Sequence, residues 1–186
     1  MAQSMEARLH FTTAKELFQA LPAIEEDIRA RPANETALDF LGLLRASATP
    51  EEAITYSAYL LPRRQAVWWG HQCVKRLAHL LTDQDLAMLD LARDWVVESD
   101  EPQRWRALTQ ALAARNKTPG VWICLAAGWS GGSLAPPEAP RVAPMPFLTP
   151  RALNTGIQAA LAKVETANRA KVLDGFVDGC IAMVTR

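Results

Sequence analysis

The feature that most constrains this chain is a threonine that recurs where a helix would begin. Three Thr-Pro pairs share this pattern: Thr49–Pro50, Thr118–Pro119 and Thr149–Pro150. A threonine oxygen can accept a hydrogen bond from a free N–H group of the first helical turn, and proline fits that turn because it has no N–H to leave unpaired. Thr13 and Glu16 have the spacing of a capping box, and Thr82 precedes two aspartates. We therefore expect helices that begin at these positions.

The rest of the pattern is helical as well. No segment alternates polar and apolar residues over the length of a strand, so the sequence predicts an all-α fold. The start signals and breaks place helices at about residues 13–20, 34–46, 50–60, 62–81, 83–98, 101–116, 119–129, 150–164 and 167–184. Short loops between helices usually join antiparallel neighbours. We expect a compact multi-helix bundle of antiparallel helix pairs that forms a single domain over residues 1–186.

The one long connection, residues 131–149, is rich in proline, with five prolines between positions 136 and 146. Such a stretch is stiff and extended. It is too apolar for a free linker, because it contains Leu134, Val142, Met145, Phe147 and Leu148. We expect a strap that lies across the helical body before a closing helix pair, residues 150–184. A linker to a separate C-terminal hairpin and a proline-rich ligand for another domain are the alternatives.

Charge and composition exclude several classes of protein. The chain has 20 basic and 20 acidic residues, so its net charge gives no basis for attraction to nucleic acid. It has no apolar run long enough to cross a bilayer, and the N-terminus lacks the apolar core of a signal peptide. We expect a cytoplasmic protein without membrane insertion. Cys73, Cys124 and Cys180 lie far apart among apolar neighbours, which indicates buried thiols in a reducing compartment.

The motifs that resemble catalytic or metal sites lack their required context. Residues 128–132, Gly-Trp-Ser-Gly-Gly, match the nucleophile pattern of hydrolases, but that pattern needs a strand-to-helix turn and a later histidine. All three histidines, His10, His71 and His79, come earlier. His71 and His79 lie two helical turns apart, about 12 Å, too far to share one metal ion. We expect no catalytic residues, metal or cofactor, and more readily a binding protein than an enzyme.

Six tryptophans lie between positions 68 and 129, and Trp68 is the unusual one. It projects from the polar side of its helix, among Arg64, His71, Gln72 and Lys75. An indole surrounded by cations and amides is either an anchor for a protein partner or a ring that another segment covers. These five residues form the predicted partner-binding surface. Alternatively, the ring of Trp68 has only a structural role and is covered by the proline-rich strap or by a cation–π pair with Arg64.

Residues 61–69, Leu-Pro-Arg-Arg-Gln-Ala-Val-Trp-Trp, give the chain a family resemblance. They resemble the L-P-x-R-x-A-V-W-W signature of a family of uncharacterised, all-helical bacterial proteins, a domain of unknown function. The proline-rich break and the closing helix pair are similar too, so the resemblance spans most of the chain. It implies that some members are encoded near type VI secretion genes. It implies no catalytic residues, and only Arg64, Trp68 and Trp69 match the signature as candidate positions.

The leading functional hypothesis is a non-catalytic helical adaptor or accessory protein that mediates protein–protein interaction, in a setting that the resemblance identifies as type VI secretion. Its partner would be another protein. The alternative is a small-molecule-binding protein or enzyme with a pocket lined by Trp69, Trp122 and Trp129, because such pockets have aromatic walls and few polar groups. A structural homodimer is the third hypothesis.

Overall fold

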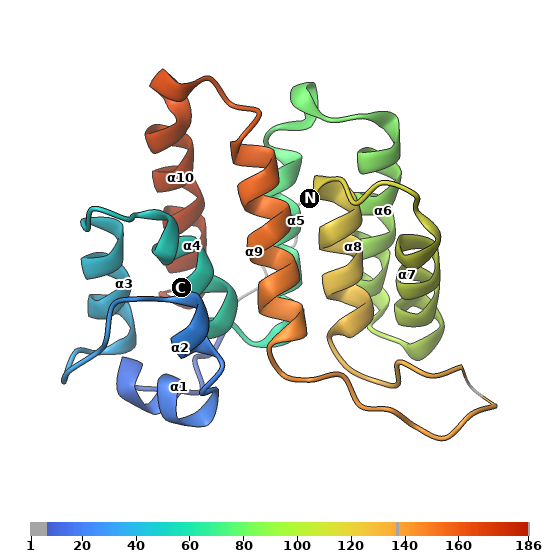
Figure 1. The fold of residues 1–186 in the computed structure, drawn as a ribbon, viewed down its shortest axis with the longest axis horizontal. Helices are drawn as coiled ribbons and strands as arrows, with labels where there is room; N and C mark the ends of the chain where they lie inside the picture. Colours follow the sequence, from blue (N-terminus) through green and yellow to red (C-terminus); the bar gives the residue numbers. More distant parts are fainter. Residues whose placement is uncertain (1–6, 137, 186) are drawn as a thin grey trace.

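Ten α-helices and one short 3-10 helix make up the secondary structure of residues 7–136 and 138–185, which this computed structural model describes (Figure 1). Their bounds are α1 Ala14–Ala20, α2 Ile24–Asp27, α3 Ala37–Arg45, α4 Glu51–Leu60, α5 Arg63–Lys75, η1 Ala78–Leu80, α6 Asp83–Glu98, α7 Glu101–Ala113, α8 Pro119–Trp129, α9 Leu148–Leu161 and α10 Thr166–Val184. No strand forms among these residues, where the only β-type pairing is an isolated bridge between Thr13 and Thr36. The predicted all-α fold is confirmed.

The threonine signals fix several helix starts. The capping box predicted at Thr13 forms, and Thr82 makes a second one with Asp85. The three Thr-Pro pairs do not make the predicted cap. Pro50 is the N-cap residue of α4, and Thr118 is that of α8, but neither helix has a side-chain capping bond. Helix α9 begins at Leu148, so Thr149 lies inside its first turn. The hydroxyl of Thr149 donates to the carbonyl oxygen of Ala126 at 3.4 Å instead of capping the helix. The structure also adds the short α2 and divides the predicted helix 62–81 into α5 and η1.

Helices α5 and α9 lie side by side at the centre of the bundle (Figure 1). On one side α8 packs against α9, and α6 and α7 pack against α8. On the other side α4 packs against α9, and α3 and α10 pack against α4. The last two helices are thus in contact with the earlier ones, because α9 also meets α5, and α10 meets α3 and α5.

A buried carboxylate joins the starts of α6 and α8. Asp85 is 0% exposed, and its side chain accepts hydrogen bonds from the backbone N–H of Thr82 at 3.1 Å and of Gly120 at 2.7 Å. A Cβ at Gly120 would lie 2.3 Å from the carbonyl oxygen of Asp85, so only glycine permits this approach. Burial opposes the charge of Asp85, but these hydrogen bonds outweigh it and lower the pKa of the carboxyl.

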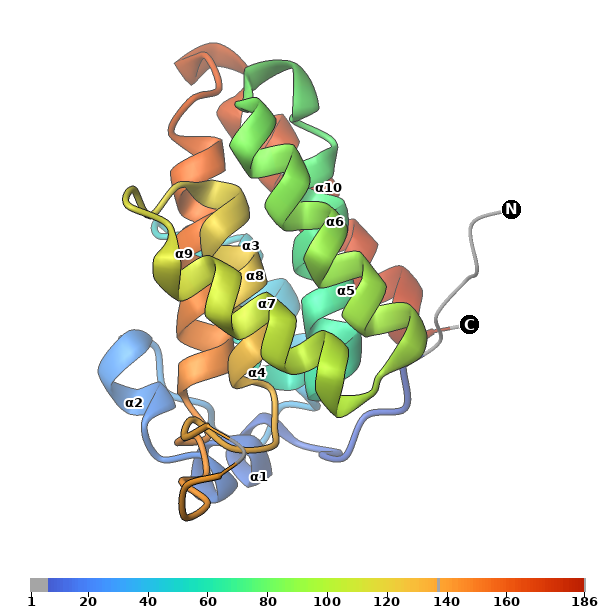
Figure 2. The ribbon, with the colours of Figure 1, turned by 90° about the vertical axis from the view of Figure 1, so that its right-hand side faces the viewer.

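The proline-rich segment precedes the last two helices, as predicted, but it ends at residue 147 and not at 149, because α9 begins at Leu148. It lies at the end of the bundle where α8 ends and α9 begins (Figures 1 and 2). The segment folds back on itself, since the N–H of Leu134 donates to the carbonyl oxygen of Val142 at 2.8 Å. Leu134 and Phe147 pack against the core, whereas Val142 and Met145 are exposed.

Arg104 of α7 fixes the beginning of this segment. Its side chain is 3% exposed and donates to the carbonyl oxygens of Gly128 and Ser133, the latter at 2.8 Å. It also pairs with Glu101, one turn earlier. Gly132 turns the chain around this guanidinium with a positive φ of 64°, a conformation that favours glycine. Arg104 therefore supplies hydrogen-bond donors for carbonyl oxygens at the end of α8 and in the segment that follows it.

Candidate functional site

Arg64, in the first turn of α5, is the residue of the predicted partner-binding surface that is hydrogen-bonded to α6. The Nε atom of Arg64 donates to the carbonyl oxygen of Val96 at 2.7 Å, and its Nη2 atom donates to that of Val97 at 3.3 Å. These carbonyls belong to the last turn of α6, where helix ends leave acceptors unpaired and a positive charge is favourable. Arg64 therefore links the start of α5 to the end of α6.

Trp68 is covered in part by its own neighbour. Its ring stacks on that of His71, with centroids 5.3 Å apart and planes 5° apart, and it packs against the core as a half-buried residue. His71 is only 5% exposed, and burial, together with the charges of Lys75 and Arg93, lowers its pKa to about 4. Gln72 is half-buried, and Lys75 is exposed. The partner-binding role of this surface stays a prediction.

The three tryptophans of the predicted pocket point to different neighbours. Trp69 is buried, and its Nε1 donates to the carbonyl oxygen of Phe176 in α10 at 2.9 Å. Trp122 lies beside α9, since a Cβ at Gly156 would be 3.0 Å from its Cβ. Trp129 is half-buried at the last position of α8. None of the three lines either cavity described below.

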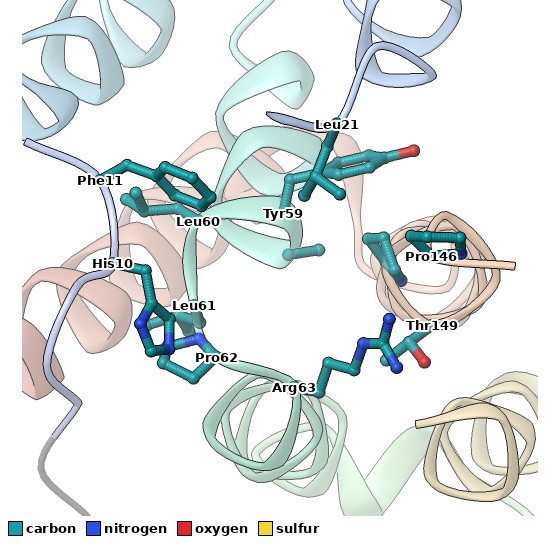
Figure 3. Close-up of a pocket in the computed structure, with 12 residues that line it drawn as sticks. His10, Phe11, Leu21, Tyr59, Leu60, Leu61, Pro62, Arg63, Pro146 and Thr149 are labelled. Carbon is teal, nitrogen blue, oxygen red and sulfur yellow. The ribbon is translucent and has the colours of Figure 1, made fainter. Parts of the chain in front are cut away.

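A cavity of about 250 Å³ opens where α4 ends and where α5 and α9 begin (Figure 3). We call it the basic cavity. Its walls are mostly apolar and come from residues 10–11, from Leu21, from residues 58–62 and from the prolines at 146 and 150. Its polar groups are His10, Tyr59, Arg63 and Thr149. Arg63 is thus the cation of this wall, and no carboxylate is among its lining residues.

Arg63 is the cation that reaches into this cavity. Its Nη1 atom donates to the carbonyl oxygen of Ser130 at 3.1 Å, and its guanidinium lies beside Thr149 at the edge of the cavity (Figure 3). The residue lies at the first position of α5, where Pro62 provides no side-chain cap and no acidic residue occupies the first turn. The positive end of the helix dipole therefore adds to the charge of Arg63.

A second cavity of about 240 Å³ adjoins the first, and we call it the apolar cavity. Its lining comes from residues 20–23 and from Met145, Pro146 and Phe147, with Tyr59 as the shared inner wall. Leu21, Tyr59 and Pro146 line both cavities. Met145 is 57% exposed at its rim. The two cavities are neighbours that share these three wall residues, and we call the pair the end groove.

An ionic network behind the end groove holds its walls. The hydroxyl of Tyr59 donates to Asp27 at 2.5 Å, and Arg151 donates to the same carboxylate at 2.8 Å. Arg151 also pairs with Glu26 at 2.8 Å and lies 4.4 Å from the centroid of the Phe147 ring. These contacts join α2, α4 and α9. Arg151 of α9 makes charged hydrogen bonds to α2 and a cation–π contact with Phe147, and Tyr59 of α4 donates to the same carboxylate of Asp27.

Sequence reasoning missed this groove. The signal for Arg63 was present, because Pro62 cannot continue α4 and so places the next residue at the start of a new helix. Leu61, Pro62 and Arg63 are also part of the signature segment. No comparable signal marks Tyr59 or Met145, because their neighbours in the cavities are distant in the sequence.

The three cysteines are free and buried, as their apolar neighbours predicted. Burial raises the pKa of Cys124 and of Cys180 to about 12, so both thiols stay protonated at neutral pH. Within residues 7–136 and 138–185, no group of three or more histidine, cysteine or acidic side chains could hold a metal ion. In the same part of the chain, no helix is long and apolar enough to cross a membrane.

The comparisons with known proteins identify one family. A family model described as a family of unknown function (DUF6931) matches residues 40–184. This match contains the signature segment, the proline-rich segment and the last two helices, but it begins after α1 and α2. No curated protein and no solved structure matches the chain.

Proposed function

This chain belongs to the family of unknown function DUF6931, and we propose that it is a non-catalytic helical adaptor that binds another protein through the end groove. The observation that supports this proposal is the pair of adjoining cavities beside an exposed apolar rim. Methionine is enriched in protein interfaces, whereas charged residues are depleted from the interface core. An exposed Met145 at the mouth of an apolar cavity therefore suits a docking surface.

The sizes of the cavities favour a polypeptide over a compact ligand. Pockets for small molecules usually hold about 300–1,000 Å³ and enclose most of the ligand. Here each cavity is smaller, at about 250 and 240 Å³, and both open on the same end of the molecule. Two small, neighbouring hollows accept two side chains of one extended segment. A small molecule that fills both cavities is the competing outcome.

Site-specific photocrosslinking in the cells that make the protein tests this proposal. A benzophenone amino acid replaces Met145 in one variant and Val97 in a matched control, because both are apolar and 57% exposed. Val97 lies on α6 and does not line the end groove. We expect a discrete crosslinked protein from position 145 and none from position 97. Equal products at both positions, or only a product of doubled mass, would contradict the adaptor.

A third crosslinker at Lys75 compares the end groove with the surface predicted on α5. Lys75 is exposed, unlike the buried His71 beside it. A product from position 75 without one from position 145 would place the partner on α5. The proposed setting in type VI secretion rests on the family resemblance, and it predicts that the protein captured from position 145 is a component of that secretion machine.

A further inference from the structure

We infer that the occupant of the end groove is an acidic and apolar segment of the partner protein. One carboxylate of this segment would enter the basic cavity, and a neighbouring apolar side chain would enter the apolar cavity. The inference rests on the proposed adaptor function, since it specifies the chemistry of the partner at that same site.

The charges around the end groove favour an anion. Arg63 and His10 line it, and no aspartate or glutamate is among the lining residues of either cavity. The nearest carboxylate in the network behind the groove is that of Asp27, which Tyr59 and Arg151 already engage at 2.5 and 2.8 Å. The basic cavity therefore presents the charge of Arg63 with no carboxylate in its lining, which favours an anionic side chain over a cationic one there.

Arg63 has the donors that a carboxylate needs. A guanidinium carries five N–H groups, and the hydrogen bond to Ser130 uses one of them. Its side chain lines the basic cavity and ends beside Thr149 at the cavity edge, and its other N–H groups remain available to a bound carboxylate (Figure 3). Arginine binds carboxylates through two parallel hydrogen bonds, which gives orientation as well as attraction. The apolar cavity, next to it across Tyr59, then receives the following side chain.

The shared wall explains why both chemistries belong to one segment. Leu21, Tyr59 and Pro146 separate the two cavities by the thickness of single side chains. A carboxylate alone would leave the apolar cavity and Met145 unused. An apolar segment alone would gain nothing from Arg63. A segment with both groups uses the whole groove.

The test is a titration of the isotope-labelled full chain with three acetylated, amidated hexapeptides, followed through its backbone amide resonances. Each peptide carries three leucines, and these alternate with three aspartates, three asparagines or three lysines. We expect the aspartate peptide to shift the amides of Leu60, Arg63, Met145 and Phe147. It should bind about fivefold more tightly than the asparagine peptide, the ratio that one exposed ion pair provides. The lysine peptide should bind most weakly.

Two arginine variants sharpen this result. Arg63→Gln should make the aspartate and asparagine peptides equal, whereas Arg106→Gln, at an exposed position of α7 outside the groove, should preserve their ratio. Equal binding of the two peptides to the unaltered chain would overturn the inference but leave the adaptor to the crosslinks at Met145. Absence of shifts in the end groove with every peptide would overturn it too. So would the same shifts from acetate alone, since the site would then be one for small anions only.

Discussion

The two sides of the bundle differ in how deeply their charged links are buried. Around α6, α7 and α8, two charged side chains that link different helices are buried, with Asp85 at 0% and Arg104 at 3% exposure, although Arg93 also forms exposed pairs within α6. Around α2, α3, α9 and α10 the links are ion pairs at the surface, where Arg45 binds Asp174 and Asp178, and Arg151 binds the acidic residues of α2. Removing the partner of a buried charge costs several times more than breaking a screened pair.

This difference has a consequence for the end groove. The groove is built on the side with surface ion pairs, because Tyr59, Phe147 and residues 20–23 are held by α2, α4 and α9. Buried polar links fix one arrangement, whereas exposed pairs can exchange with water at little cost. The side with buried links therefore acts as the scaffold, and the other side carries the surface that can adjust to a partner.

The largest expected effect is the loss of the buried guanidinium. Arg104→Met should lower the free energy of unfolding by about 3 kcal/mol, because it leaves the carbonyl oxygens of Gly128 and Ser133 without their donor. Urea unfolding measures the change. Arg106→Met, at an exposed position of the same helix, is the control and should change stability by less than about 0.5 kcal/mol. Equal losses in the two variants would remove the contrast between buried and exposed cations.

The free energy of unfolding should also depend on pH, through the buried His71 of α5. The pKa of this residue is about 4 in the folded chain and 6.5 as its ordinary value, so between these values only the unfolded chain binds the proton. Stability is then complete above pH 6.5 and falls on acidification toward pH 4, by on the order of 3 kcal/mol for this group. His71→Phe should flatten this part of the curve.

The exposed His79 supplies the control for that measurement. His79→Phe removes an imidazole at an exposed position by the same substitution, and the flattening expected for His71→Phe should be absent from it. If both variants flattened the curve equally, the burial of His71 would not be the cause.

The smallest effect is expected on the side with surface pairs. Arg151→Met should lower the free energy of unfolding by about 1 kcal/mol at low ionic strength, because it removes the ion pairs with Asp27 and Glu26. Salt screens such pairs, so the difference from the unaltered chain should shrink between about 0.05 and 0.5 M sodium chloride. A loss that does not depend on salt would mean that the stacking of Arg151 on Phe147, and not its charge, holds α9.

Much of the fold was predictable because its signals are local. Thr13 and Thr82 cap the helices that they were expected to cap, since a capping box needs only residues three positions apart. The start of α9 was not predictable in the same way. The hydroxyl of Thr149 finds a partner in Ala126 of α8, a contact that depends on how the helices pack.

The site shows the same division more strongly. A helical projection places Trp68 and His71 on the polar side of α5, whereas in the structure Trp68 packs against the core and His71 is buried. The projection contains no information on α6, which accepts the hydrogen bonds of Arg64. The end groove unites the segment before α1, residues 20–23, the end of α4, the start of α5, and residues 145–147 with the start of α9. Local periodicity cannot indicate a surface made by five segments that meet only in the folded chain.

The folded-back form of the proline-rich segment affects the entropy of any association at its rim. The ring of proline fixes φ, and the hydrogen bond between Leu134 and Val142 closes the segment on itself, so much of its backbone freedom is already lost when the chain folds. A partner that contacts Met145 and Pro146 would therefore meet a surface that needs little further ordering. The cost of immobilisation would fall on the partner's own segment, and this preorganisation would lengthen the lifetime of the complex more than it would speed its formation.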